Sequence, residues 1–567
     1  MKKFITANDI TALGRQGKTE YVMGPDDQLT DLARETARRR GIRLVRAENV
    51  RPPLPLPEKA PAGSAAASSK APPLSPPRPY VPPAQAGTPG VRQAVSASWS
   101  RAQSAPAPVP PAVRPEVSVL PRYDMMIENG TVILPEAGRL AVNLCIKDGR
   151  VAALTTESAS AVSRVDASGL YVLPGIVDPH THLGLFAPLE EELETETRSA
   201  LLGGVTTIGT FFNRPDSYLP LLDFLERQVP DRSRVDIFPH LTLREEAQLA
   251  ELPHYCARGM NSYKVYMCGI PGLFPHQEDG FIVRCMQKLA ALPADPILCV
   301  HAENTSIVEY AQTAAASLPM DTLEAFAKSH PNLSESEAVV RTAHLSKELG
   351  FRTYIVHTSC RESIEALRAA RHDKLFVETT SPYLSLDTES DVGAYGKMLP
   401  PFRSPGDRKA LWDGIREGII DTIGTDNTTI TSAEKQVMDG MAKAGAGYPA
   451  LATHLVSVLN EGFFRQEIPL EKLVPLMTRN PAKIFGIYPQ KGTLLPGSDA
   501  DLVLVDMNES RTADPAGLMS RSDFSLFQGK TLRAWPRGTI KGGRIAAWDG
   551  KLTDDIPSGR LLKHGML

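Results

Sequence analysis

The chain has 567 residues, which is too long for one small domain and predicts a large catalytic unit with additional modules. A formal net charge of -3 gives no reason to expect nucleic acid or an anionic membrane as the main partner, and favours a small soluble substrate. The six cysteines include no C-x-x-C pair, and no apolar run is long enough for a membrane span or a secretory signal, so we expect a cytoplasmic protein.

Residues 1–50 indicate a small N-terminal module. A strand-like start at Lys3 to Thr6 precedes the turn residues Gly24 and Pro25, and a helix from Thr30 to Arg40 should end at Gly41. Residues 51–121 consist mainly of Pro and Ala with some Ser. Such a segment buries too little apolar surface to offset the entropy of ordering, so we expect a disordered, semi-extended linker.

Residues 122–172 should form the first half of a β-sandwich. Their apolar residues alternate and glycine turns separate them, which predicts antiparallel strands at DMMIENG, TVILPE, LAVNLCIKDG and RVAALTT. Short strands return near the C-terminus at DADLVLVD, GTIKGGRIAAWDG and RLLKHG. Residues 491–567 should therefore complete the sandwich and form a C-terminal tail.

Residues 173–490 predict a (β/α)₈ barrel of the TIM type, which places the chain in the α/β class. Eight short apolar runs recur along this part, and sequences that can form helices lie between most of them. The runs are YVLPGIVD, VTTIGTF, VDIFPH, SYKVYM, ILCVH, TYIVH, KLFVE and DTIGTD. The helical stretches are ETETRSALLGG, DFLERQ, VRCMQKLAAL, SEAVVRTAHLSKELG and RESIEALRAARH.

Candidate metal ligands fall at the ends of the predicted strands. In barrels of this kind the carboxyl ends of the strands meet at one mouth, where active sites lie. Six residues share this rim, namely His180, His182, Lys264, His301, His357 and Asp426. Alternate residues of a strand project to the same side, so His180 and His182 can bind one ion, and imidazole nitrogens suit Zn²⁺. A His-x-His pair alone is a weak signal, but the joint pattern indicates a metal site.

Lys264 could supply an anionic bridge between two metal ions. A buried lysine near dications loses its proton readily, and its neutral amine can take up CO₂ to give a carbamate. Considered alone, this lysine would more often be a cation paired with a carboxylate. A hydroxide held between the ions would be a nucleophile at neutral pH, and Asp426 would pass its proton to the leaving nitrogen. Lys264 and Asp426 are therefore the candidate catalytic residues.

From Tyr123 to its end, the chain resembles the amidohydrolases that act on cyclic amides, which are the hydantoinases, dihydropyrimidinases, allantoinases and dihydroorotases. The segments that carry this resemblance are VLPGIVDPHTHLG, ETETRSALLGGVTTI, SYKVYM, VHAEN, YIVHTS, LPPFRS, IGTDN and RNPAKIFGIYPQKGTLLPGSDADLVLVD. The last segment is most similar to hydantoinases and dihydropyrimidinases. The resemblance implies two Zn²⁺ ions bridged by carboxylated Lys264, a (β/α)₈ barrel, and a homo-oligomer, either a tetramer or a dimer.

The same resemblance implies hydrolysis of a hydantoin or dihydropyrimidine to an N-carbamoyl amino acid. Three alternatives stay open at this point: an allantoinase-type specificity, a dihydroorotase-type specificity, and a non-catalytic scaffold with the amidohydrolase fold. Asn213 and Arg214, which follow the second run, and Arg403 of LPPFRS are candidates for substrate binding, and each can equally be a structural loop residue.

Departures from the family pattern concern residues near the substrate. Hydantoinases carry a tyrosine five residues after the bridging lysine, which polarises the substrate carbonyl, whereas this chain has Gly269. Tyr266 lies nearby, but we interpret it as an aromatic residue packed in a barrel strand. Asn427 follows Asp426 where the family often has histidine, and ETTSPYL has Ser381 and Pro382 where relatives such as allantoinases have Pro-His.

A second resemblance concerns the N-terminus. MKKFITANDI followed by LTDLARETARRRGIRL is similar to the start of the Q-type ethanolamine-utilisation protein of bacterial microcompartments. This resemblance implies that residues 1–50 are a tag that binds shell or core proteins and places the enzyme in the microcompartment lumen, in a pathway of pyrimidine or ureide degradation. The alternative is an inert appendage.

Overall fold

The protein is described by a computed structural model over residues 3–5, 20–23, 27–29, 31–39, 42–46, 123–270, 273–317 and 319–564. The chain divides into two units, residues 1–119 and residues 120–567. The expected linker at residues 51–121 and the turn residues Gly24, Pro25 and Gly41 lie outside the described residues. No helix in the described ranges combines the length and the apolar character that crossing a bilayer requires.

The described residues of the first unit form short parallel strand pairs and the helix α2 (Asp31–Arg39). Strand β1 (Lys3–Ile5) pairs with β3 (Asp27–Leu29), and β2 (Glu20–Met23) pairs with β4 (Arg43–Arg46). Helix α2 (Asp31–Arg39) buries Ala33 and Ala37, which are four residues apart and so share one face. The predicted initial strand and the predicted helix are therefore confirmed.

The second unit is built on a closed barrel of parallel strands. Its strands follow the chain order around the sheet, and β20 (Asn427–Thr428), which comes directly after the eighth strand, pairs with the first strand and closes the ring. The barrel strands are β12 (Ile176–His182), β13 (Val205–Phe212), β14 (Asp236–Thr242), β15 (Ser262–Tyr266), β16 (Ile297–His301), β17 (Thr353–Ile355), β18 (Leu375–Thr380) and β19 (Thr422–Gly424). The predicted (β/α)₈ fold is confirmed.

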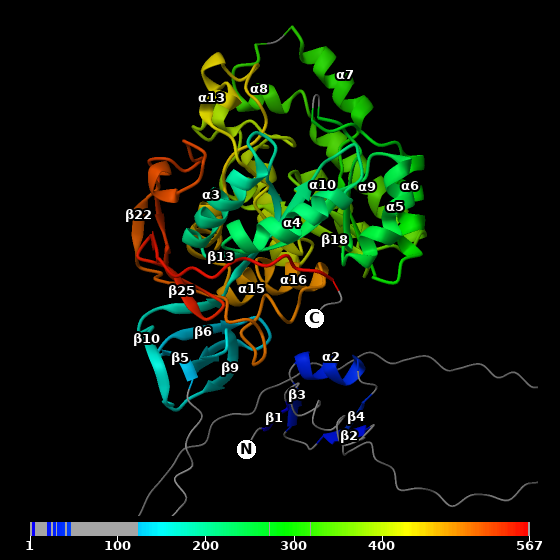
Figure 1. Cartoon of the computed structure of the whole chain (residues 1–567). Helices are drawn as coiled ribbons and strands as arrows, with labels where there is room; N and C mark the ends of the chain where they lie inside the picture. The colour runs from blue at the N-terminus through cyan, green and yellow to red at the C-terminus, as the bar shows by residue number, and fades with distance from the viewer. Residues whose placement is uncertain are drawn as a thin grey trace, which may run out of the picture. The chain divides into compact units, whose positions relative to one another are not determined.

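Helices surround this barrel (Figure 1). The helices between consecutive strands are α3 (Leu189–Leu202), α4 (Leu219–Arg232), α5 (Glu246–Ala257), α6 (Asp279–Ala290), α7 (Thr305–Ala315), α8 (Leu323–Ala327), α9 (Asn332–Glu348), α10 (Arg361–Ala370), α11 (Ser381–Ser385) and α12 (Pro405–Glu417). Those after the last strand are α13 (Ser432–Lys435), α14 (His454–Val458), α15 (Leu470–Leu476) and α16 (Arg479–Ile484). The helical stretches named from the sequence lie in α3, α4, α6, α9 and α10.

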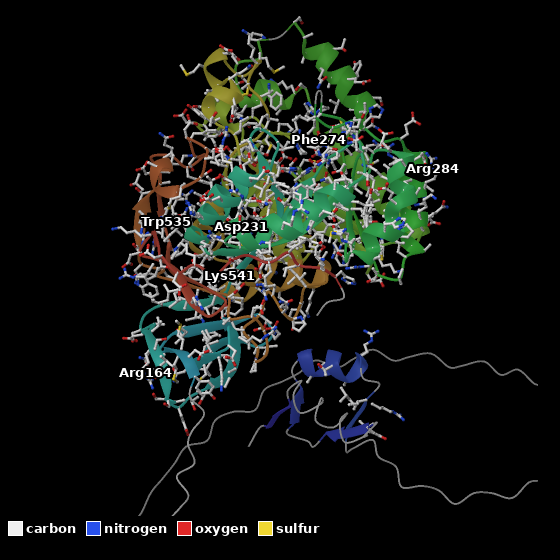
Figure 2. The ribbon with its side chains drawn as sticks, in the orientation of Figure 1. Arg164, Asp231, Phe274, Arg284, Trp535 and Lys541 are labelled. Carbon is white, nitrogen blue, oxygen red and sulfur yellow. The ribbon has the colours of Figure 1, made fainter. Side chains whose placement is uncertain are left out.

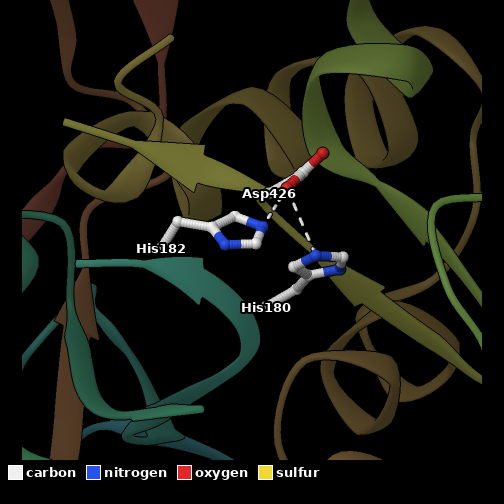
Figure 3. A group of neighbouring side chains, drawn as sticks. All are labelled: His180, His182 and Asp426. Atoms are coloured by element: carbon white, nitrogen blue, oxygen red, sulfur yellow. Dashed lines mark ion pairs between the residues drawn. The ribbon is translucent and has the colours of Figure 1, made fainter. Parts of the chain in front are cut away.

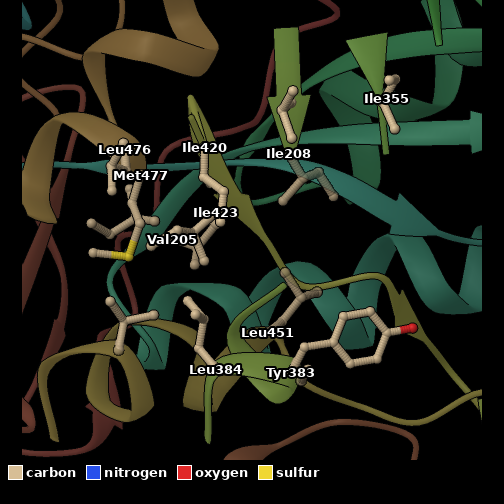
Figure 4. Packing of buried hydrophobic residues seen from close by; sticks show 14 of the residues in the cluster. Val205, Ile208, Ile355, Tyr383, Leu384, Ile420, Ile423, Leu451, Leu476 and Met477 are labelled. Atoms are coloured by element: carbon tan, nitrogen blue, oxygen red, sulfur yellow. The ribbon is translucent and has the colours of Figure 1, made fainter. Parts of the chain in front are cut away.

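The strands are apolar because both faces of a parallel barrel sheet are covered. Val205 and Ile208 of β13 and Ile423 of β19 belong to one large core cluster with Leu476 and Met477 of the C-terminal helical region (Figure 4). These side chains fix the barrel wall, which in turn fixes the positions of the strand ends.

Two further sheets form the sandwich. One has the order β10-β5-β8-β9 and the other β26-β25-β24-β21-β11-β6-β7, so segments before and after the barrel share the second sheet. Figure 1 shows the cyan strands beside the red strands. Before the barrel lie β5 (Tyr123–Glu128), β6 (Thr131–Leu134), β7 (Gly138–Ala141), β8 (Asn143–Lys147), β9 (Arg150–Thr155), β10 (Ala161–Asp166) and β11 (Tyr171–Pro174). After it lie β21 (Leu502–Val505), β24 (Pro536–Lys541), β25 (Arg544–Trp548) and β26 (Lys551–Leu552), and β22 (Ser510–Thr512) pairs separately with β23 (Thr531–Arg533).

The strand predictions need three corrections. The expected antiparallel hairpins are present, but β5 also pairs in parallel with β10, and β6 with β11, because these later strands return by longer connections. The first apolar run is divided at Gly175, so Tyr171–Pro174 joins the sandwich and only Ile176–His182 enters the barrel. A Cβ atom at Gly175 would lie 2.2 Å from the Thr206 hydroxyl, which explains why the chain crosses there at a glycine.

The third correction concerns RLLKHG, which is not a strand of the sandwich. Leu561 instead forms an isolated bridge with Ile237 at the start of β14. Arg560 holds this segment in place through ion pairs with the buried Asp236 and with Asp499. Lys491 lies in the same charge cluster, 2.5 Å from Asp236 and 3.0 Å from Asp499. The cluster occupies the amino end of β14, opposite the predicted mouth.

Candidate functional site

The carboxyl ends of the barrel strands bring all six predicted metal ligands into one region. Two of these residues lie on β12, Lys264 lies on β15, His301 ends β16, and the other two directly follow β17 and β19. All six are buried. A single pocket is lined by His180, His182, His301, His357 and Asp426, together with apolar side chains.

The first group within this pocket contains His180, His182 and Asp426 (Figure 3). The Nε2 atoms of His180 and His182 lie 3.2 and 3.1 Å from the same Asp426 oxygen, Oδ1. Their ligand atoms all lie within 4.8 Å of one another. Thr181 points elsewhere and bonds Thr210, as the alternation of a strand requires. This group can therefore hold one cation with two nitrogens and one carboxylate oxygen.

The second group contains His301 and His357. The Nδ1 atom of His301 lies 2.9 Å from the Nε2 atom of His357. The other ring nitrogen of His301 contacts Oε2 of Glu303 at 3.0 Å, so the carboxylate fixes the proton on Nε2 and leaves the Nδ1 lone pair facing His357. Two imidazole nitrogens on one tetrahedral zinc ion would be about 3.3 Å apart. The observed separation is close to that value.

Glu378 links the two groups. Its Oε2 atom accepts from the Nδ1 atom of His180 at 2.8 Å and from the backbone N–H of His357 at 3.0 Å. The first contact leaves Nε2 of His180 free to bind a cation. Burial raises the pKa of Glu378 to about 8. Glu378 thus orients one ligand by its side chain and another by its backbone.

Backbone geometry also positions the ligands. His357 has a φ of 41° and Asp426 a φ of 55°, which is the left-handed region that non-glycine residues seldom adopt. Asp178 joins the first and eighth strands, because its carboxylate accepts from the backbone N–H groups of His180 and Thr425, both at 3.1 Å. These contacts place His180 beside Asp426.

Lys264 is fully buried, and its amine has no hydrogen-bond partner among the described residues. The Nζ atom lies 4.5 Å from the centre of the Phe211 ring and 5.0 Å from that of Tyr266. Burial lowers the pKa of Lys264 to about 8, so about a tenth of the amine is neutral at pH 7, far more than for an exposed lysine. An unpaired buried amine costs free energy, and a carbamate that binds cations would remove this cost.

These donors fit a pair of zinc ions. Burial lowers the pKa of His180 and of His357 well below the ordinary value, which keeps both rings neutral as metal binding requires. The pKa of Asp426 is also lowered: burial is the largest single effect and would raise it, but His180, His182 and Lys264 together outweigh burial. The buried Nε2 atom of His180 and Nζ atom of Lys264 lack hydrogen-bond partners, so a cation would satisfy groups that the protein leaves unsatisfied.

A loop after β15 covers one side of the pocket. Its turn is closed by a hydrogen bond of 2.7 Å from the Ile270 N–H to the Phe274 carbonyl. A Cβ atom at Gly269 would lie 2.8 Å from that carbonyl oxygen and 2.9 Å from the His276 nitrogen. Any side chain at this position would disrupt the turn. Phe274, labelled in Figure 2, instead stacks on Tyr266 with ring centres 4.5 Å apart.

The expected substrate-binding residues have structural contacts. Neither Asn213 nor Arg403 lines the pocket. Asn213 donates to the Leu273 carbonyl at 2.8 Å and so supports the covering loop, while Arg214 is exposed. Arg403 is buried, donates to the Ser359 hydroxyl at 3.0 Å and pairs with Glu335.

Two of the residues that depart from the family pattern, Asn427 and Ser381, also lie outside the pocket lining. Asn427 accepts from the Ala450 N–H at 2.8 Å, and Ser381 bonds His454 at 2.9 Å. Both contacts are structural. Of the departures noted in the sequence, Gly269 therefore belongs to the loop that covers the pocket, while Asn427 and Ser381 do not face it.

Sequence analysis missed Glu378 and Glu303, and named Tyr266 only as a packed aromatic residue. A signal for Glu378 was present, because the seventh apolar run ends with this carboxylate at the same rim as the other ligands. Glu303 follows His301 by two residues in VHAEN. Tyr266, interpreted as a packed aromatic, does pack, but it also lines the pocket.

Comparison with known proteins gives consistent similarities. The model of the amidohydrolase family matches residues 171–546. The L-hydantoinase of Paenarthrobacter aurescens is 32% identical over 446 residues, which cover 76% of this chain and 96% of that protein. A D-phenylhydantoinase of Escherichia coli O1:K1 is 31% identical over 463 residues, covering 78% and 98%.

Solved structures show the same similarity. The L-hydantoinase (dihydropyrimidinase) from Arthrobacter aurescens superposes with a TM-score of 0.73 and 29% identity, over 78% of this chain and 100% of that one. The dihydropyrimidinase from Brevibacillus agri superposes with a TM-score of 0.71 and 27% identity, over 78% and 98%. The part that these proteins lack corresponds in length to the N-terminal module and linker.

Proposed function

The chain belongs to the amidohydrolase family, in the group of hydantoinases and dihydropyrimidinases, and on this premise we propose that it hydrolyses a hydantoin or dihydropyrimidine to an N-carbamoyl amino acid. The observation that carries this proposal is the convergence of four histidines, Lys264 and Asp426 at one barrel mouth. Side chains from five strands meet there with their ring nitrogens oriented by buried carboxylates.

The residues divide naturally between two zinc ions. His180, His182 and Asp426 would hold one ion, His301 and His357 the other, and a carboxylated Lys264 would bridge them. When bound, such ions supply a water molecule of lowered pKa as the nucleophile. The uncharged form of Lys264, which its burial favours, is the form that can take up CO₂.

Asp426 moves the proton in this reaction. The oxygen of the attacking water bonds to the amide carbon, the C–N bond breaks, and the nitrogen leaves with the proton that Asp426 accepted from the water. Water and the cyclic amide thus give one carboxylic acid, which ionises by releasing its proton to solvent, and one ureido nitrogen. Asp426 is suited to this role because its neighbours lower the pKa of its carboxyl and keep it ionised before the reaction.

The remaining pocket wall supports a substrate with an apolar ring substituent. Beside the predicted ligands, most of the lining side chains are apolar, and they are Leu185, Phe186, Ile270, Leu273, Phe274, Met398, Leu399 and Ala446. No lysine or arginine lines the pocket in the part of the chain that the structure describes. A hydantoin with an alkyl or aryl substituent therefore fits better than dihydroorotate, whose carboxylate would require a cationic partner.

Two measurements test this proposal. Elemental analysis of the purified protein should find about two zinc ions per chain, as the binuclear site requires. The zinc-loaded protein is then assayed against hydantoin, a substituted hydantoin, dihydrouracil, allantoin and dihydroorotate. Turnover of the hydantoins supports the proposal. Turnover of allantoin or dihydroorotate alone would show that the proposed substrate, a hydantoin or dihydropyrimidine, is wrong. Absence of both zinc and turnover would favour a non-catalytic scaffold.

We also propose that residues 1–50 act as a docking tag for microcompartment shell or core proteins, and that the barrel forms homo-oligomers. The resemblance of MKKFITANDI to the ethanolamine-utilisation protein supports the tag. Deletion of residues 1–121 should leave turnover intact and abolish co-sedimentation with such an assembly. Unchanged co-sedimentation would contradict the tag, and light scattering of the same truncated protein tests the oligomer.

A further inference from the structure

Hydrolysis of an amide needs a donor for the carbonyl oxygen, because negative charge develops there when the carbon is attacked. Gly269 cannot provide one: it has no side chain, and the turn of Phe274 and His276 occupies the space that a side chain would need. A side-chain hydrogen-bond donor for this oxygen would therefore have to come from another residue of the pocket wall.

Two hydroxyl groups are available there, those of Tyr266 and Thr428. Apart from five of the predicted metal ligands, these are the polar side chains that line the pocket within the described residues. The question is which hydroxyl is held in place before the substrate binds, since a donor fixed in advance needs no reorganisation during the reaction.

Tyr266 is the better fixed of the two. It lies two residues after Lys264 on β15, so both side chains project to the same side of the strand. Its ring stacks on Phe274 at an interplanar angle of 11°, and its centre lies 5.3 Å from that of His301. The side chain is only 3% exposed, so its rotamer is set by packing on the metal-binding side of the barrel.

The Tyr266 hydroxyl is free to bind a ligand. No described residue forms a hydrogen bond with it, and its oxygen is not among the partnerless polar atoms that are sealed from solvent. Tyr266 lines the same pocket as His301 and Asp426, so a substrate held there would contact this side chain. A tyrosine hydroxyl in an apolar surrounding usually has a partner, which a bound substrate would provide here.

We propose that the Tyr266 hydroxyl donates the hydrogen bond to the substrate carbonyl oxygen that becomes negative during attack. This assignment rests on the proposed cyclic-amide hydrolysis and identifies the donor for that reaction. The hydrogen bond strengthens as the C=O bond becomes a C–O⁻ bond, and it weakens again when the C–N bond breaks and the carbonyl re-forms. Its contribution therefore belongs to the transition state more than to substrate binding.

The test compares three variants of the full-length, zinc-loaded protein on whichever cyclic amide the wild type hydrolyses. Tyr266→Phe removes the proposed donor and keeps the ring, Thr428→Val removes the rival hydroxyl, and Tyr310→Phe removes a hydroxyl from a surface residue that is 76% exposed. Loss of one such donor typically lowers kcat about 100- to 1000-fold. We expect this loss for Tyr266→Phe, with KM changed by less than about threefold.

Zinc content and thermal unfolding of Tyr266→Phe should match the wild type, because the ring that packs on Phe274 is retained. Tyr310→Phe should keep full activity. Unchanged kcat in Tyr266→Phe, a loss confined to Thr428→Val, or a rise in KM in place of a fall in kcat would each overturn the assignment. A wild-type protein inactive on every cyclic amide would show instead that the proposed function is wrong, and the assignment would fall with it.

Discussion

Replacement of Glu378 offers a direct perturbation of the metal site without removal of a ligand. One oxygen of this carboxylate contacts both the His180 ring and the His357 backbone, and the other has no hydrogen-bond partner. Glu378→Gln can keep an acceptor in the first position and removes the ionisable carboxyl. Glu378→Ala loses both. Groups that orient histidine ligands typically contribute 10- to 100-fold to metal affinity.

We therefore expect a graded loss, of about 10-fold in zinc affinity for Glu378→Gln and about 100-fold for Glu378→Ala, or roughly 1.4 and 2.8 kcal/mol. The assay is competition of the metal-free protein with a chromophoric chelator of known affinity. Glu417→Gln, which alters a surface carboxylate paired with Arg368, is the matched control and should bind zinc like the wild type. Wild-type affinity in both Glu378 variants would refute the account of this residue as the holder of two ligands.

Further predictions concern the ligands and the stability of the fold. Lys264→Ala and Asp426→Asn should each reduce turnover below detection, and Lys264→Ala should also lower the zinc content; retained activity in a steady-state assay would refute the mechanism. Glu192 is fully buried, and burial raises the pKa of its carboxyl to about 8. Because this folded-state pKa exceeds the unfolded value, its stabilising contribution is complete below about pH 4.5 and is lost as pH rises toward 8. Glu192→Gln should therefore have the same melting temperature as the wild type at pH 4.5. At pH 9 it should melt at a higher temperature, because its free energy of unfolding should exceed that of the wild type by on the order of 1.4 kcal/mol per unit of the pKa shift. Equal melting temperatures at pH 9 would contradict this. Lys491→Met leaves Asp236, Asp499 and Asp501 with less compensating charge and should lower the free energy of unfolding by about 3–5 kcal/mol in a denaturant titration, whereas a loss below about 1 kcal/mol would show that Lys541 and Arg560 suffice.

The sequence predicted the barrel because its signals are local. Buried parallel strands are continuous apolar runs, and the residues that close them lie at the mouth, so His301 and Asp426, with Lys264 inside the fourth run, could be assigned to one rim before their distances were known. Glu378 was not predicted, although it lies at the end of the seventh run and the same reasoning would place its carboxylate at the mouth.

Other features depend on contacts between distant segments, which no local pattern reports. The division of the first run at Gly175 follows from the approach of Thr206, and the position of Leu561 follows from the ion pairs of Arg560. The role of Tyr266 was underestimated for a similar reason. The sequence does not distinguish a tyrosine that only packs from one whose hydroxyl also lacks a hydrogen-bond partner. In the structure, the loop that stacks Phe274 on the Tyr266 ring shows how this side chain is held.

The most direct test of the central claim is the anomalous diffraction of a crystal grown with zinc, recorded at the zinc edge. We expect two peaks at the barrel mouth, one beside His180, His182 and Asp426 and the other beside His301 and His357, with continuous density between them for a carboxylated Lys264. A mouth without zinc, or a Lys264 amine that points away from both positions, would contradict the binuclear site on which the proposed hydrolysis depends.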